Sequence, residues 1–352
     1  MQAGPSVTAR LVEPDGHARK LCTLAEAGGT KGDAMARMDL RVRLIGRLVG
    51  LVSVSKMDDA RLRKVQQRRI GHNPVTDLLF GAVAEGVRLT DRTAKGEIGP
   101  VPIRVYRPDQ PVGTSLPLVV NFHGGGWTIG SLDTADWLCS HVSATTGAVV
   151  VSVDYRLAPG HRWPAAAEDC YQALVDVVDR AAEFGADAGR IAVMGDSAGG
   201  NLAAVVSLMA RDRSGPPIAH QGLIYPAVDL TMSSPSIEQN AQAPILTKAD
   251  CLAFRNHYLG GQDPKQPYAS PLFADDLSGL PPALVQVAEH DPIRDDGRRY
   301  AAALTEAGVP VRLTEYVGMP HGYLAFPRLC RSAPQALAEL CSEQATALAR
   351  RP

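Results

Sequence analysis

The stretch IAVMGDSAGGNLAA, residues 191–204, decides the fold, because an apolar run passes through Gly195-Asp196-Ser197-Ala198-Gly199 directly into a helix-forming segment. A G-x-S-x-G motif between a strand and a helix makes a turn so sharp that its serine adopts strained backbone angles, and the flanking glycines remove side chains that would clash. The serine then lies at a helix N-terminus, where unpaired N–H groups stabilise negative charge. The pattern favours Ser197 as a nucleophile over a purely structural turn.

Short apolar runs recur on both sides of this turn, and helix-like segments separate them. The runs are LVVNF (118–122), AVVVSVDY (148–155), RIAVMG (190–195), QGLIYP (221–226), ALVQVAE (283–289) and VRLTEYV (311–317). Most of them are nearly continuous in apolar residues, as strands covered on both faces must be. The alternation predicts the α/β class, with a mostly parallel sheet flanked by helices, preceded by an antiparallel hairpin over 87–108.

Two regions depart from this alternation of strands and helices. Between Ala227 and Pro282 the alternation is absent for more than fifty residues. Because a compact domain seldom carries so long a structureless loop, we expect a lid there. Residues 1 to about 35 predict a loosely packed leader, and the leucine spacing from 38 to about 69 predicts helices. We therefore expect a leader and cap helices over 1–75, and a catalytic domain over 76–352 with a cap insertion at about 228–281.

A serine nucleophile needs a base, and in parallel sheets functional side chains gather at the carboxyl ends of the strands. Of the histidines that follow Ser197, His220 precedes its strand and His257 falls in the expected lid. His290 ends a strand but leaves no room for an acid before it. His321 follows the run VRLTEYV at the correct end of a strand. It is the predicted base.

The acid partner is expected between the serine and the histidine in the chain. Asp291 follows the run ALVQVAE at a strand's carboxyl end and is the predicted acid, with the task of holding the His321 imidazole in one tautomer. Asp295 and Asp296 open the next helix and suit its dipole. Asp229, at the start of the expected lid, is the weaker alternative.

The segment VVNFHGGGWTIG, residues 119–130, places three consecutive glycines after an apolar run. Such a triplet costs conformational entropy unless the backbone must approach something closely. Attack on a carbonyl creates an oxyanion that needs bare backbone N–H donors, so we assign that task to the loop His123–Gly126, with a further donor from Ala198. His123 itself is expected to be structural. Trp127 either walls the acyl pocket or packs in the core.

The composition limits the remaining function classes. A net charge of −1 gives no electrostatic reason to expect a nucleic-acid partner, and the six scattered cysteines show no metal-binding spacing. Reduced thiols and the lack of a signal-peptide pattern indicate a cytoplasmic protein. The apolar stretch 40–54 is interrupted by three arginines, so we expect no transmembrane segment.

Several motifs in this order make the sequence similar to the bacterial hormone-sensitive-lipase family of α/β-hydrolases, over about residues 75–345. They are HGGGW (123–127), DYRLAPGHRWPAAAEDC (154–170), GDSAGGNLA (195–203), EHDPIRDDG (289–297) and GMPHGY (318–323). The resemblance implies an α/β-hydrolase core with a helical cap, and hydrolysis of short- to medium-chain carboxylic esters without a cofactor. One departure is Gly160, where the family usually has glutamate.

The resemblance also implies roles for single residues. It assigns the nucleophile, acid and base to Ser197, Asp291 and His321. It assigns the oxyanion donors to Gly125, Gly126 and Ala198, with Gly124 shaping the turn, and we expect Gly124 and Trp127 to border the substrate.

The expected activity is that of a serine carboxylesterase acting on a small-molecule ester. An amidase or formamidase with the same triad and a lipase for longer acylglycerols are the alternatives. A non-catalytic binding module is disfavoured because all three triad residues are present. A homodimer is left open, since the strand at 311–317 is a candidate for pairing between two copies.

Overall fold

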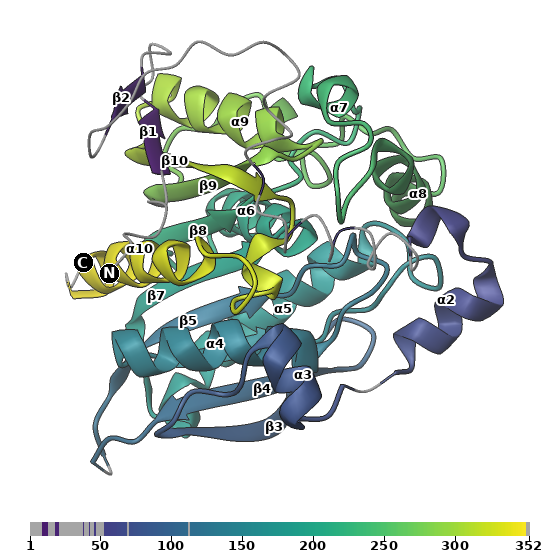
Figure 1. Cartoon of the computed structure of the whole chain (residues 1–352). Coiled ribbons are helices and arrows are strands. Elements are labelled where there is room, and N and C mark those ends of the chain that lie inside the picture. Colours follow the sequence, from purple (N-terminus) through teal and green to yellow (C-terminus); the bar gives the residue numbers. More distant parts are fainter. Residues whose placement is uncertain are drawn as a thin grey trace, which may run out of the picture.

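A computed structural model describes residues 9–12, 18–20, 38, 42, 46, 53–68, 70–111 and 113–349. Within these ranges ten strands form one sheet, in the order β2-β1-β10-β9-β8-β7-β5-β6-β4-β3 (Figure 1). The strands are β1 (Ala9–Val12), β2 (Ala18–Lys20), β3 (Val87–Lys95), β4 (Pro100–Pro108), β5 (Leu116–Phe122), β6 (Val149–Val153), β7 (Ala186–Asp196), β8 (His220–Ile224), β9 (Ala283–His290) and β10 (Val311–Pro320).

The centre of the sheet is parallel, from β6 through β5, β7, β8 and β9 to β10, and the pairs at both ends are antiparallel. Every residue of β6 and of β8 is buried, so both faces of these strands are covered. On β5, Leu118 and Val120 belong to one apolar cluster and Val119 to another, as alternation across a sheet requires. The predicted fold class and the hairpin, observed as β3 and β4, are confirmed.

Helices cover both faces of the sheet. On one face lie α4 (Leu132–Thr146) and α10 (Ala333–Ala349), and on the other lie α5 (Ala165–Asp179), α6 (Ala198–Asp212) and α9 (Arg294–Glu306) (Figure 1). Short 3-10 helices, η4 (Ala181–Phe184), η5 (Pro271–Phe273) and η6 (Tyr323–Ala325), complete the connections. The sheet core therefore has the two helical layers that an α/β arrangement needs.

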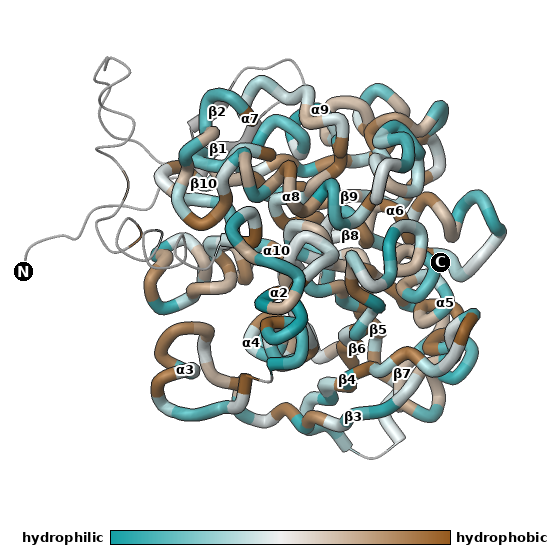
Figure 2. The backbone as a smooth tube through the Cα atoms, turned by 90° about the vertical axis from the view of Figure 1, so that its right-hand side faces the viewer, coloured by the Kyte–Doolittle hydropathy of each residue, from teal (hydrophilic) through white to brown (hydrophobic). Residues whose placement is uncertain are grey.

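Shorter elements from two parts of the chain lie outside the sheet and its covering helices. The N-terminal part supplies η3 (Val54–Lys56), α2 (Asp59–Gln66) and α3 (Pro74–Phe80), and the insertion after β8 supplies α7 (Ser236–Gln239) and α8 (Lys248–Leu259). Helix α2 is mostly hydrophilic and buries only Leu62, whereas η3 packs directly against α8 (Figure 2). The lid expected at about 228–281 thus contains α7, α8 and η5, although its domain limits stay a prediction.

The N-terminal sequence departs from the expected loose leader at two places. Residues 9–12 and 18–20 form β1 and β2, and β1 pairs antiparallel with β10, Ala9 lying opposite Tyr316. Such short strands carry no periodic signal of their own and depend on the neighbouring strand. Because β1 covers β10, the strand at 311–317 is not a free edge for pairing between two copies. The helix expected from residue 38 lies largely outside the described residues, apart from positions 38, 42 and 46, as does Cys22.

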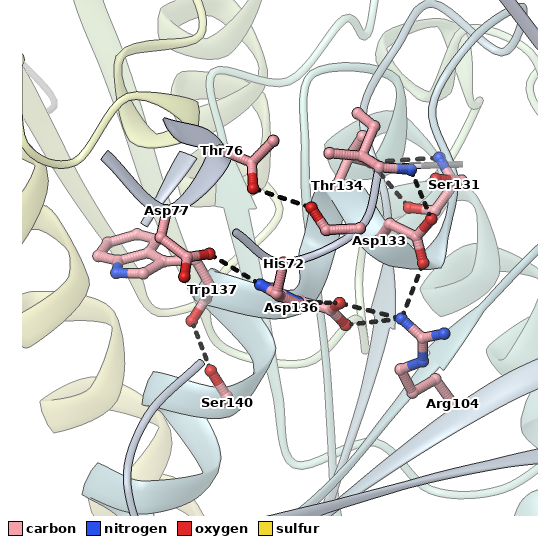
Figure 3. A network of polar contacts seen from close by, with 12 residues as sticks. His72, Thr76, Asp77, Arg104, Ser131, Asp133, Thr134, Asp136, Trp137 and Ser140 are labelled. Carbon is pink, nitrogen blue, oxygen red and sulfur yellow. Dashed lines mark hydrogen bonds and ion pairs between the residues drawn. The ribbon is translucent and has the colours of Figure 1, made fainter. Parts of the chain in front are cut away.

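A polar network joins the N-terminal segment to α4 (Figure 3). His72 lies between two carboxylates, with Nε2 at 2.9 Å from Asp136 and Nδ1 at 3.0 Å from Asp77. Arg104 of β4 donates to Asp136 and to Asp133, both at 3.0 Å. Asp136 is buried, so these charged hydrogen bonds compensate for its loss of solvent. They fix the chain where it passes from the cap to the sheet.

Candidate active site

Ser197 lies between the end of β7 and the start of α6, and its φ of 56° and ψ of −116° are the strained angles expected of the turn. A Cβ on Gly195 would run into the backbone carbonyl of Gly199, and a Cβ on Gly199 into that of Phe122. Both glycines are therefore required by the close approach of backbone. Such a serine conformation costs about 1–3 kcal/mol and persists only where the surrounding structure holds it.

The predicted base and acid meet this serine. The Ser197 hydroxyl donates to His321 Nε2 at 2.8 Å, and His321 Nδ1 donates to Asp291 Oδ2 at 2.7 Å. The register of the sheet explains why residues far apart in the chain converge, because Pro320 of β10 lies opposite His290 of β9. Asp291 and His321, the next residues in each chain segment, therefore leave adjacent strand ends side by side. The carboxylate fixes the tautomer that leaves Nε2 free to accept the serine proton.

The alternative acid lies elsewhere. Asp229 is fully buried, but its carboxylate accepts from Arg299 and from Ser233, each at 2.6 Å. Asp296 accepts from Ser234, and burial raises its pKa well above the ordinary value. Neither carboxylate contacts His321. Asp291 alone of the three is placed to orient the imidazole.

The other downstream histidines also lie apart from Ser197. His220 begins β8, at the opposite end of the strand, and burial lowers its pKa to about 4. His257 belongs to the last turn of α8. His290 ends β9 next to Glu289, and burial lowers its pKa. The elimination made from strand order is consistent with these positions.

Two carbonyl groups of the glycine loop are held by hydrogen bonds. The Gly124 carbonyl accepts from His123 Nδ1 at 2.8 Å, and the Gly125 carbonyl accepts from the Ile129 N–H at 2.9 Å. Because C=O and N–H are antiparallel across a trans peptide, fixing these two carbonyls directs the N–H groups of Gly125 and Gly126 the other way. The Ala198 N–H, at the first position of α6, is one of the unpaired donors of a helix start.

Gly124 differs from its two neighbours. Its N–H donates to Asp196 Oδ1 at 2.8 Å, so it is committed to the elbow and is not free to bind an oxyanion. Burial raises the pKa of Asp196. This contact, which joins the glycine loop to the residue before the serine, was not predicted from the sequence, and no local pattern signals it.

The three glycines meet different neighbours. A Cβ on Gly124 would clash with the Asp196 carboxylate, and a Cβ on Gly125, at φ +115°, with the backbone of Ile129. A Cβ on Gly126, at φ +59°, would occupy the space of the Phe254 ring on α8. The loop is thus pressed against the elbow, against itself and against the lid.

A cavity of about 300 Å³ opens onto this site. Its walls include the serine and imidazole, the glycine loop and mainly apolar side chains, namely Trp127, Ile129, Leu230, Met232, Ile245, Leu246, Phe254, Ile293 and Phe326. Trp127 also stacks on Tyr258 of α8, with ring centroids 4.4 Å apart and planes at 5°. Trp127 therefore packs in the core and also borders the cavity, whereas its contact with an acyl group stays a prediction.

The described residues also bear on metal sites, reactive thiols and membrane-spanning helices. Within the described ranges, no group of three or more His, Cys, Asp or Glu side chains is arranged to hold a metal ion. The described cysteines at 139, 170, 251 and 341 are buried free thiols, and Cys330 is buried as well. Among the described helices, none has the length and apolar character needed to cross a membrane.

Known proteins are similar to this chain in sequence and in fold. Residues 119–325 match the model of a family described by the alpha/beta hydrolase fold. The chain is 43% identical over 281 residues to Esterase LipI of Mycobacterium tuberculosis, across 79% of this chain and 86% of that protein. It is 46% identical over 255 residues to Carboxylesterase NlhH of the same bacterium, across 71% and 80% of the two chains.

Among solved structures, a hyperthermophilic esterase from the archaeon Pyrobaculum calidifontis matches with a TM-score of 0.75 and 39% identity, over 88% of this chain and 98% of that one. The chain is thus more than 40% identical to two named esterases and shares its fold with a third along most of its length. The serine–imidazole–carboxylate contacts described above agree with this similarity. The chain therefore belongs to the α/β-hydrolase fold family, in its hormone-sensitive-lipase-like branch, and is a carboxylic ester hydrolase.

Proposed function

We propose that the chain hydrolyses short- to medium-chain carboxylic esters through an acyl-enzyme on Ser197. The Ser197 oxygen attacks the ester carbonyl as its proton passes to His321 Nε2. The tetrahedral intermediate collapses, and the alcohol leaves with that proton. Water then attacks the acyl-enzyme, giving a proton to His321, and the carboxylic acid departs as Ser197 regains its own. Asp291 stabilises the imidazolium in both steps.

The oxyanion of each tetrahedral intermediate binds the N–H groups of Gly125, Gly126 and Ala198. Their directions, fixed by the carbonyl contacts of the glycine loop, support this role. Donors held in place before the reaction need no reorganisation when charge develops, and losing one typically costs about 10²–10³ in kcat.

The size and lining of the cavity support the substrate class. About 300 Å³ is at the lower end of ligand pockets, and its walls are largely apolar side chains. An acyl chain of a few carbons gains burial there, whereas a long chain meets Phe254 and Phe326. This favours an esterase over a lipase for longer acylglycerols.

The observation that carries the proposal is the pair of contacts at 2.8 and 2.7 Å that joins Ser197, His321 and Asp291. The test is hydrolysis of p-nitrophenyl esters from two to sixteen carbons, with Ser197→Ala as control. We expect the highest kcat/KM at short to medium chains and no turnover by the variant. A matching p-nitroanilide separates esterase from amidase. Activity that survives Ser197→Ala would contradict the assignment.

Further parts of the proposal concern the chain as a whole. We infer that residues 1–75 and about 228–281 together form the cap, supported by the packing of η3 on α8. The buried free thiols at positions 139, 170, 251 and 341 support a cytoplasmic location, which fractionation of cells would test. A homodimer stays a prediction, to be checked by light scattering.

A further inference from the structure

One side chain of the cap, which the mechanism above does not use, contacts the segment just after the glycine loop. Gln66, the last residue of α2, lies with its Nε2 at 2.8 Å from the Thr128 carbonyl and 2.8 Å from the Ala158 carbonyl. Both neighbouring groups are acceptors, so only the NH₂ of the amide fits there, and it donates both of its protons. Thr128 and Ala158 have no exposed surface. A half-buried cap residue is thus hydrogen-bonded to two fully buried parts of the core.

Thr128 holds two of the three glycine carbonyls. Its N–H donates to the Gly125 carbonyl at 3.1 Å, and its hydroxyl donates to the Gly126 carbonyl at 2.9 Å. Ala158, the second acceptor of Gln66, donates its own N–H to the Trp127 carbonyl at 2.8 Å. Gln66 therefore binds two residues that donate to carbonyls of the segment Gly125–Trp127.

The segment that carries Gln66 is anchored at its other end as well. Asp250 of α8 accepts hydrogen bonds from the Ser53 hydroxyl and, at 3.1 Å, from the Ser55 N–H. Just after Gln66, the Ile70 N–H donates to Asp133 at 3.0 Å. The chain is thus held on both sides of Gln66, at residues 53 and 55 and at residue 70, so its amide is presented to Thr128 from a fixed position.

We propose that Gln66 is a positioning residue of the oxyanion hole. By holding Thr128, which bonds the Gly125 carbonyl, it keeps the Gly126 N–H group aimed at the developing oxyanion. It thereby makes the cap part of the machinery that sets kcat. The inference rests on the oxyanion role proposed above. It goes beyond that role because it assigns a function to a cap residue that never touches the substrate.

The test compares Gln66→Ala with Gln67→Ala, a matched control at the next position, whose side chain is exposed. Gln66→Ala removes both hydrogen bonds without touching the cavity. We expect kcat for p-nitrophenyl butyrate to fall by about 10–100-fold, less than the loss of a direct donor, with KM nearly unchanged. Gln67→Ala should retain wild-type kcat. Thermal unfolding of each variant establishes that it is folded.

Gln66→Glu adds a readout that a purely structural role would not move. A carboxylate at this position repels both carbonyl oxygens, whereas a protonated carboxyl restores one donor. Because the ordinary pKa of glutamate is about 4.3, kcat relative to wild type should rise as pH falls from 7 to about 4.5. The hollow that Gln66 borders also contains charged or titratable side chains, namely Asp59, Arg63, Arg68, Asp154, His161 and Arg162. Gln66→Ala retains all of them, so its ratio to wild type should stay flat over the same range.

The outcomes are distinguishable from failure of the proposed function. If wild type hydrolyses the ester and Ser197→Ala does not, the esterase assignment stands whatever Gln66 does. Given that, unchanged kcat in Gln66→Ala, an equal loss in Gln67→Ala, or a pH-independent ratio for Gln66→Glu would overturn the positioning role. A selective kcat loss together with the pH-dependent ratio would establish it.

Discussion

Replacing Asp291 by asparagine tests how the triad is held. Two donors reach this carboxylate on separate oxygens, because the Ile293 N–H donates to Oδ1 at 2.9 Å and His321 Nδ1 donates to Oδ2 at 2.7 Å. An asparagine has only one acceptor oxygen. The backbone N–H of Ile293 can do nothing but donate, so the amide oxygen takes that place and the NH₂ faces His321.

The consequence is that the His321 imidazole adopts the other tautomer. With an NH₂ opposite Nδ1, His321 must accept there and carry its proton on Nε2, which then points at the Ser197 hydroxyl. In that tautomer the ring cannot take the serine proton. We expect kcat at neutral pH to fall by about 10⁴-fold, equivalent to about 5 kcal/mol of transition-state stabilisation. The structure should otherwise stay intact, because the side chain retains its shape.

Steady-state hydrolysis of p-nitrophenyl butyrate, with thermal unfolding of each variant, measures the effect. Asp296→Asn is the matched control, since Asp296 is also buried but lies away from the imidazole. An asparagine there can accept from the Asp229 N–H and donate to the Ser234 hydroxyl, so it should change kcat little. An Asp291→Asn variant that is folded and within tenfold of wild type would refute the tautomer reasoning. So would an equal loss in the control.

Burial lowers the pKa of His72, but its hydrogen bonds to Asp136 and Asp77 outweigh burial and raise the pKa above 6.5. The pairing therefore stabilises the fold fully below pH 6.5, and this stabilisation is lost as pH rises through the raised pKa. In urea unfolding, His72→Gln should lower the free energy of unfolding more at pH 5.5 than at pH 8.5. Equal losses at the two pH values would contradict this. Phe254→Ala should shift the preferred ester toward longer chains, by about fourfold in relative kcat/KM for each added methylene that becomes buried, and an unchanged chain-length profile would place the acyl group elsewhere. Asp196→Asn retains an acceptor for the Gly124 N–H and should keep most activity. Asp196→Ala leaves that N–H unpaired and should lower kcat by about tenfold, a cost near 1–2 kcal/mol. Similar kinetics for the two variants would argue against the contact between Asp196 and Gly124.

The fold and the proposed catalytic residues were predictable because their signals are local. A buried strand requires a continuous apolar run, and the elbow requires glycine on both sides of Ser197. The meeting of Asp291 and His321 then follows from parallel strands, whose carboxyl ends share one edge of the sheet. Each step uses at most a few neighbouring residues and a general rule of sheet topology.

The cavity walls were not predictable in the same way. Ile245 borders the cavity at φ +73°, and Met232 does so at φ +61°. Such angles are unfavourable for a side chain with a Cβ, and most of all for a β-branched one, so local propensity argues against the observed backbone. Tertiary packing imposes these conformations. Strand β1 and the Gln66 contact escape sequence reasoning for the same reason, because their partners are more than sixty residues away.

Each of the three glycines is required for a different reason. Gly124 is constrained by the elbow through Asp196 and Gly125 by the turn of its own loop, whereas Gly126 is constrained by Phe254 of the lid. Gln66 meets the same loop from the other part of the cap. A cap fitted to the loop at two points cannot be exchanged as an independent specificity module. Grafting another cap onto this core should therefore lower kcat as well as change the preferred acyl chain, unless the contacts of Gln66 and Phe254 are grafted with it.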